Sequence, residues 1–290
     1  MKLQKLAALS GFLALVATAG AKAIMIAPLP PAQRVALADA VIVGKVTSIE
    51  SKLVTAARFP GDKEKGEFTI AIVKIDETLL GAKGLTTVRV GFIVPKPVAV
   101  PAPVPGPGPI VIRKPIRRYP TANLVLDQEA CLFLTKHPDE PFYTLPAYYD
   151  VISKKDNPAF AKEMETVKKA AKLLADPKEG FESKDAEERF LTAALVLTRY
   201  QRVAPGTVGQ PKTAPIGAEE SKKILLAIAD ADWVNAGTGF ARMNPQMMFN
   251  RLPNKAGWVQ PTDFKVFPEA AKKWLKDNAE TYRVQKYISE

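Results

Sequence analysis

The sequence has very few of the side chains that metal sites and many enzymes use. Its 290 residues include a single cysteine, Cys131, and a single histidine, His137. One of each excludes a cysteine-rich zinc site, an iron–sulfur cluster and an intrachain disulfide framework. The sequence therefore predicts no metal and no cofactor, and it weighs against an enzyme.

Acidic residues are also in the minority. The chain has 30 Asp and Glu against 41 Lys and Arg, a formal net charge of +11, with 47% hydrophobic and 24% charged residues. This composition fits a globular protein and not a disordered one. The basic excess raises a nucleic-acid hypothesis. The basic residues of the C-terminal half are interleaved with acids, however, and export would remove that partner, so nucleic acid is disfavoured.

Residues 1–21 have the three parts of a secretory signal peptide. Lys2 and Lys5 precede an apolar run of 13 residues, 6–18, and small residues then place cleavage after Ala21 or Ala23. A membrane span needs about 20 apolar residues, so the run is too short to cross a bilayer. A retained signal anchor is the alternative. We expect a secreted or periplasmic protein with no membrane span after signal removal.

Residues 35–153 have a β-type pattern. In the run 85–94 we expect Val88, Val90 and Phe92 to point inward and Thr87 and Arg89 outward. The five β-type runs are 40–49, 68–75, 85–94, 124–134 and 142–152. Five strands joined by loops suit a small closed or partly closed barrel of the OB type.

Three segments of this region resemble netrin-like domains, the OB barrel shared with tissue inhibitors of metalloproteinases. They read ADAVIVGKV at 38–46, VKIDETLLG at 73–81 and QEACLFL at 128–134. The resemblance spans about 35–153 and implies an OB fold. It departs at Leu80, where the family usually has Lys, and at Asp127, where it has Gly. The inhibitors bind zinc through an N-terminal Cys, and none lies near this mature N-terminus, so their mechanism does not carry over.

The stretch 95–120 is rich in proline and positive charge. Nine of its 26 residues are proline, which lacks the N–H that a sheet needs, so the stretch predicts an extended insertion between strands. It lies within a segment, between Glu77 and Asp127, that has no acidic residue. This cationic arm could bind an anionic polymer, a membrane surface or a protein; the alternative is a solvated insert at a loop tip. The candidate binding residues are Lys96, Arg113, Lys114, Arg117 and Arg118.

Residues 157–290 predict a helical domain, either a bundle or a short solenoid. Its first helix has an apolar stripe at 160, 164, 167, 171 and 174. Asp185 and Glu188 suggest a capping box for a second helix, whose run 190–197 is apolar on nearly all sides and typical of a central helix. Further helices are expected at 218–231, from Asn244-Pro245 onward, and at 268–281.

The search for catalytic chemistry gives weak candidates. His137 lies beside Pro138 in a turn between strands, a position typical of a surface residue, and no G-x-S-x-G motif accompanies it. The carboxylate pairs at 187–188 and 219–220 fall in first turns of predicted helices, where they favourably face the helix dipole. Cys131 lies in an apolar run and suits a small buried hydrophobe. Met243, Met247 and Met248 could offer thioether ligands to copper, but their helical spacing favours packing.

The sequence thus predicts an α+β multidomain protein, with a five-stranded OB-like barrel at 35–153 followed by the helical domain. We expect an exported, non-catalytic binding or scaffold protein of the cell envelope, acting through the cationic arm, a barrel face or both. Its partner would be a protein or an anionic envelope polymer. Two alternatives remain: a modulator or inhibitor of an exported protease, based on the resemblance, and a hydrolase built on His137.

Overall fold

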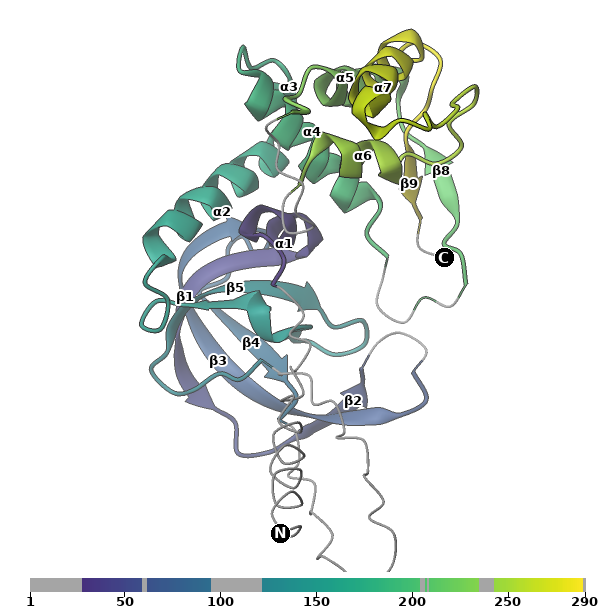
Figure 1. The fold of residues 1–290 in the computed structure, drawn as a ribbon. Coiled ribbons are helices and arrows are strands. Elements are labelled where there is room, and N and C mark those ends of the chain that lie inside the picture. Colours follow the sequence, from purple (N-terminus) through teal and green to yellow (C-terminus); the bar gives the residue numbers. More distant parts are fainter. Residues whose placement is uncertain are drawn as a thin grey trace, which may run out of the picture.

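The chain forms a mixed α/β structure, seen in a computed structural model that describes residues 28–58, 62–94, 122–203, 207, 209–234 and 243–288. A strongly curved sheet of seven strands is built mainly from the first half of the chain, and most helices come from the second half (Figure 1). The predicted signal peptide, 1–21, lies outside the described residues, as does the proline-rich insert 95–120.

The large sheet follows the order β1-β3-β4-β6-β5-β7, with β2 paired to β3 and an additional pairing between β1 and β5. The β4–β6 pair is parallel, and the other pairs are antiparallel. The strands are β1 (Ala40–Ile49), β2 (Val54–Ala57), β3 (Lys65–Leu80), β4 (Thr87–Phe92), β5 (Glu129–Lys136), β6 (Tyr143–Thr144) and β7 (Val151–Ser153).

Alternation along the strands sorts their side chains onto two faces. On β4, Val88, Val90 and Phe92 are buried in the sheet core, which confirms the predicted inward face. The long strand β3 supplies two cores. Its Ala71 and Val73 join the sheet core, whereas Phe68 and Ile70 pack with Ala56 and Phe142 in a smaller cluster.

The prediction of one continuous strand at 142–152 is wrong. The chain forms β6, a 3₁₀ turn at Tyr148–Asp150 and then β7. Pro146 cannot donate to a sheet ladder. The Asp150 carboxylate accepts a hydrogen bond from the Ala147 N–H at 2.8 Å, which closes the turn. The short strand β2 is also absent from the sequence prediction, because its four residues carry little pattern.

Seven α-helices occur in the described part of the chain. The helix from 160, the helix from 185 and the three later ones match the sequence prediction, while two short helices, α1 and α3, were not predicted. Proline lies at the start of both. The helices are α1 (Pro31–Leu37), α2 (Phe160–Ala175), α3 (Pro177–Phe181), α4 (Ala186–Tyr200), α5 (Ala218–Ala229), α6 (Pro245–Arg251) and α7 (Phe267–Asp277).

Helix starts follow their capping residues. Asn244 caps α6 by accepting from the Met247 N–H at 2.8 Å, as expected. Asp185 caps α4 through the Glu187 N–H at 2.9 Å. The predicted capping box is only partly formed, because the carboxylate of Glu188 accepts from the Ser183 hydroxyl at 3.3 Å.

A small antiparallel ribbon completes the C-terminal half and corrects the purely helical prediction. Strand β8 (Thr213–Pro215) pairs with β9 (Gln285–Tyr287), and the Val284 N–H at the start of this ribbon donates to the buried Ser221 hydroxyl of α5. The ribbon therefore holds the chain beyond α7 against α5.

One hydrophobic cluster joins the sheet to the helices. It contains Val41, Cys131 and Phe133 from the sheet together with Val167 of α2 and Leu195 of α4. Helices α1 and α2 lie directly beside the sheet in Figure 1, and α4 packs on both of them. A second helical cluster surrounds α4, whose residues 192–198 are all buried, as predicted for a central helix.

Candidate functional site

The predicted binding arm lies outside the described residues, so its geometry stays a prediction. The five cationic candidates are Lys96, Arg113, Lys114, Arg117 and Arg118. Their partner, a protein or an anionic envelope polymer, likewise stays a prediction.

His137 is buried, which corrects the expectation of a surface side chain. Only 1% of the residue is exposed. Its Nδ1 accepts from the N–H groups of Asp139 and Glu140, both at 3.1 Å, so the ring proton is assigned to Nε2, which donates to the Ala57 carbonyl at 2.8 Å. The ring also packs against Phe68 and Phe142. Both nitrogens hold backbone in place, so this imidazole has no free nitrogen for a general base.

The other catalytic candidates also have structural surroundings. Glu187 and Glu188 lie in the first turn of α4, and Glu219 and Glu220 in the first turn of α5. Glu220 accepts from the Tyr200 hydroxyl at 2.7 Å. These carboxylates favourably face their helix dipoles, as predicted.

The sulfur-bearing candidates are packed into cores. Burial raises the pKa of the Cys131 thiol to about 12, so this cysteine is a buried hydrophobe and not a nucleophile. Met248 is fully buried, and Met243 and Met247 pack against the helical cluster. This packing favours the hydrophobic interpretation over copper ligation.

A buried arginine that no sequence pattern predicts lies between α1 and the sheet. Arg34 is 6% exposed, its guanidinium lies 4.6 Å from the centroid of the Phe133 ring, and it donates to the Tyr149 carbonyl. Glu163 of α2 lies 3.8 Å away. Desolvation by burial lowers the pKa of Arg34. Arg34 thereby connects α1, α2 and the turn before β7, and only non-local contacts reveal this role.

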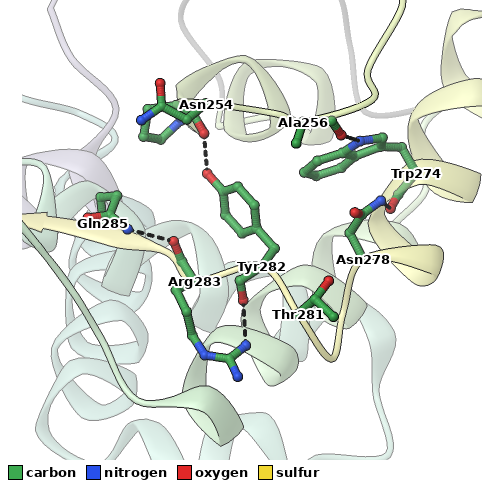
Figure 2. A pocket seen from close by; sticks show the side chains of 9 residues that line it. Asn254, Ala256, Trp274, Asn278, Thr281, Tyr282, Arg283 and Gln285 are labelled. Carbon is green, nitrogen blue, oxygen red and sulfur yellow. Dashed lines mark hydrogen bonds between the residues drawn. The ribbon is translucent and has the colours of Figure 1, made fainter.

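A pocket of about 400 Å³ lies at the C-terminal end of the helical half (Figure 2). The loop after α6, the end of α7 and the segment that leads into β9 form its walls. Its lining residues are Pro253, Asn254, Ala256, Trp274, Asn278, Thr281, Tyr282, Arg283 and Gln285. The sequence does not predict this pocket, because none of its three segments, 253–256, 274–278 and 281–285, carries a motif.

Hydrogen bonds hold the aromatic wall of this pocket. The Trp274 indole N–H donates to the Ala256 carbonyl at 2.9 Å, and the Tyr282 hydroxyl donates to the Pro253 carbonyl, as Figure 2 shows. The two rings meet edge to face at 5.4 Å between centroids. Both polar ends of the aromatic pair are therefore engaged, and the pair acts as a rigid wall.

Several polar groups of the lining keep hydrogen-bonding capacity. Nη1 of Arg283 donates to the carbonyls of Glu280 and Tyr282, at 2.8 and 2.9 Å. The other guanidinium N–H groups of Arg283, and the side chains of Asn254 and Thr281, have no partner among the described residues. The Asn278 amide donates to the Trp274 carbonyl at 2.8 Å, which leaves its oxygen as an acceptor.

No family model matches the chain, and no curated protein matches it. Within the described ranges, no helix is both long and apolar enough to cross a membrane, and no group of three or more His, Cys, Asp or Glu side chains is arranged to hold a metal ion.

Proposed function

We propose that this chain is an exported, non-catalytic binding protein of the cell envelope. The proposal that the protein is non-catalytic rests on the geometry of His137. Both nitrogens of this imidazole, the only one in the sequence, are hydrogen-bonded to backbone groups. This argues against the hydrolase alternative, which depended on that imidazole. Export rests on the signal-like residues 1–21.

The strand pairing supports an OB-like barrel as the binding scaffold. The pairs β1–β3, β3–β4, β4–β6, β6–β5 and β5–β1 form a ring, and β4–β6 is the parallel pair among them. A ring of five strands in this arrangement is expected of a closed barrel of the OB type. The chain would then consist of a barrel and a helical domain that share one hydrophobic cluster, which contains Val41 and Leu195.

The cationic arm would give this scaffold affinity for an anionic partner. In the sequence it lies between β4 and β5, which belong to the same sheet. Clustered Lys and Arg attract anionic polymers, and the attraction weakens with added salt.

Cosedimentation of the full chain with envelope fractions tests the proposal. Replacing the five arm residues by Gln should abolish most of the binding, because it removes five positive charges from one segment. A matched variant removes the same charge elsewhere, from exposed lysines that have no carboxylate partner among the described residues: Lys155, Lys162, Lys169, Lys178 and Lys184. The matched variant should bind normally. Equal losses in the two variants would show only a general charge effect, and unchanged binding in the arm variant would reject the arm.

The second candidate is a modulator of an exported protease, and the OB-like ring of strands favours it. Cys131, the only cysteine, is buried in β5 and cannot serve as an N-terminal zinc ligand. We therefore expect no inhibition of a zinc protease in a direct assay. Stoichiometric inhibition would instead favour this candidate over the envelope-binding proposal.

A further inference from the structure

The loop between α6 and α7 exposes a group of large apolar side chains. Val259, Phe264 and Val266 are 82%, 69% and 51% exposed, and they fall within the eight residues 259–266. Among the described residues, Phe264 is the only aromatic side chain that is exposed. Hydrophobic residues scattered singly over a surface are normal, whereas apolar residues gathered on one segment indicate an interaction site.

Contacts at its base hold the 259–266 loop in place. The rings of Trp258 and Phe267, one at each end of the loop, lie 5.7 Å apart between centroids. Asp263 caps the short 3₁₀ turn at the end of the loop, because its carboxylate accepts from the Lys265 N–H at 2.9 Å. The loop is therefore compact with joined ends. It leads into α7, which lies at the end of the molecule away from the sheet (Figure 1).

The charge around this loop is positive. Asp263 is the only acidic residue in the stretch 243–266, which contains the basic residues Arg251, Lys255 and Lys265. Neither lysine forms a salt bridge within the described part of the chain. Apolar side chains beside cations that no carboxylate neutralises complement an anionic phospholipid surface, because the apolar groups enter the acyl region while the ammonium groups stay among the headgroups.

A protein partner fits this surface less well than lipid does. A specific protein–protein interface buries about 800 Å² on each partner, whereas an aromatic side chain supplies about 150–250 Å², and the two valines are smaller. A second copy of the chain would therefore need much more apolar surface than the loop offers. Apolar side chains can enter a bilayer without a partner surface of matching shape, and their affinity grows with the apolar area that enters.

We propose that the 259–266 loop is a membrane-contact site, in which Val259, Phe264 and Val266 enter the outer part of an anionic phospholipid bilayer and Lys265 contacts the headgroups. The contact is peripheral and needs no membrane-spanning helix. This inference goes beyond the proposed envelope binding, because it uses a different part of the chain from the cationic arm and a lipid instead of a protein or a polymer.

A fluorescent dye placed on the loop tests the proposal in the full chain. The environment-sensitive dye NBD is coupled to the variant Thr262→Cys, and the native Cys131 does not compete for it because it is fully buried. Vesicles of phosphatidylcholine and phosphatidylglycerol should raise the NBD emission and shift it to the blue. The same dye on Lys155→Cys, in the turn between β7 and α2, should not respond. No response on the loop, or equal responses at the two positions, would overturn the proposal.

Matched variants of the labelled chain test the apolar side chains. Val259→Ser combined with Phe264→Ser should weaken vesicle binding at least about 10-fold in an NBD titration, because the apolar area that enters the bilayer is lost. Leu53→Ser combined with Leu85→Ser removes two exposed apolar side chains from the sheet half and should leave binding unchanged. Since all four positions are exposed, circular dichroism should show folded chains for both variants. Equal affinities of the two variants would overturn the assignment to the loop.

The charge of the loop is tested with vesicle composition. Lys265→Gln should weaken binding to the anionic vesicles about 5-fold, and vesicles of phosphatidylcholine alone should bind the unaltered chain more weakly. Equal binding to both kinds of vesicle would overturn the proposed preference for anionic lipid. A dye response that appears without lipid and grows with protein concentration would show that a second copy covers the loop, and it would reject the lipid.

The arm variant separates this site from the proposed envelope binding. With its five arm residues replaced by Gln, the chain should keep the NBD response of the loop, because the dye reports only its own surroundings. Loss of the response in this variant would overturn the proposal of a separate lipid contact. Envelope cosedimentation is measured independently, so a failed loop and a failed arm give different results.

Discussion

Arg34 illustrates how single residues hold the two halves of this protein together. Its charged group is buried between α1, α2 and the sheet, where the Tyr149 carbonyl, the Phe133 ring and Glu163 surround it. Burying a charge is costly unless partners compensate, and removing one partner of a buried set leaves the others uncompensated. The nearby Asp150 is also buried, so the two residues should depend on each other.

The first prediction concerns Arg34→Met, which keeps an unbranched apolar stem but removes the charged guanidinium. We expect the free energy of unfolding to fall by about 3 kcal/mol, because the buried Asp150 carboxylate loses its cation. Urea unfolding monitored by circular dichroism measures this loss. Asp150→Asn in the same chain should restore part of it, while Lys155→Met at the exposed surface should change stability by less than about 0.5 kcal/mol. A loss in Arg34→Met no larger than in the Lys155 control would contradict this role.

The second prediction concerns pH. Burial raises the pKa of Asp150 from 3.8 to about 6. Between these values the native state binds more protons than the unfolded state, so the stability that this carboxyl contributes is full below pH 3.8 and is lost as pH rises through about 6. The effect is at most about 3 kcal/mol, since one pKa unit corresponds to about 1.4 kcal/mol. In urea titrations, Asp150→Asn should make the free energy of unfolding depend less on pH between pH 4 and 7. An unchanged dependence would show that other groups cause it.

At the scale of elements, His137 connects two segments that are 80 residues apart. The turn after β5 is capped by its Nδ1, and β2 is held by its Nε2 through the Ala57 carbonyl. Strand β2 has four residues and pairs only with β3 among the described strands. An edge strand this short depends on such additional contacts for its order.

The third prediction separates the two bonds of His137. In His137→Asn the amide oxygen can replace Nδ1, so the turn at 138–141 should stay protected while β2 exchanges faster. In His137→Gln the amide nitrogen can replace Nε2, so the reverse pattern is expected. Each lost hydrogen bond should cost about 1 kcal/mol, and cavity terms should add to it. Hydrogen exchange of the two segments measures the pattern. Equal exchange in both variants would show that the ring acts by packing alone.

At the scale of the whole molecule, the sheet and the helices share one hydrophobic cluster and several polar bonds. Arg202 near the end of α4 forms two hydrogen bonds to the Asp39 carboxylate, and Arg199 donates to the Ala38 carbonyl at 3.0 Å. Both contacts are at the entry to β1. Because Val41, Cys131 and Phe133 would be exposed without the helices, we expect neither half to unfold independently.

The fourth prediction tests this coupling with probes that the chain already contains. All three tryptophans, Trp233, Trp258 and Trp274, lie in the helical half, and Cys131 lies in the sheet. Tryptophan fluorescence and thiol labelling should therefore report transitions at the same urea concentration. The native thiol should label very slowly, because it is fully buried and its pKa is raised to about 12. Thiol labelling that precedes the fluorescence change would show two independently unfolding domains.

Much of the local structure could be predicted from the sequence, because it depends on contacts within a few residues. The alternation of Val88, Val90 and Phe92 predicts an inward face, and Asn244-Pro245 predicts a helix start. Side chains at such spacings share a face whatever the rest of the chain does. The candidate site was less predictable, since the arm residues were named from composition and the pocket beside Tyr282 is formed by three segments that carry no motif.

By itself, the sequence predicted the longer helices and the main strands of the large sheet, and it determined that one histidine and one cysteine are available for chemistry. Only the tertiary structure decided what those residues contact. It buried His137 under Phe68 and Phe142, and it placed Arg34 against Phe133. The reason is physical: periodicity is a property of neighbouring residues, whereas burial of a polar group depends on partners that the folded chain brings from far along the sequence.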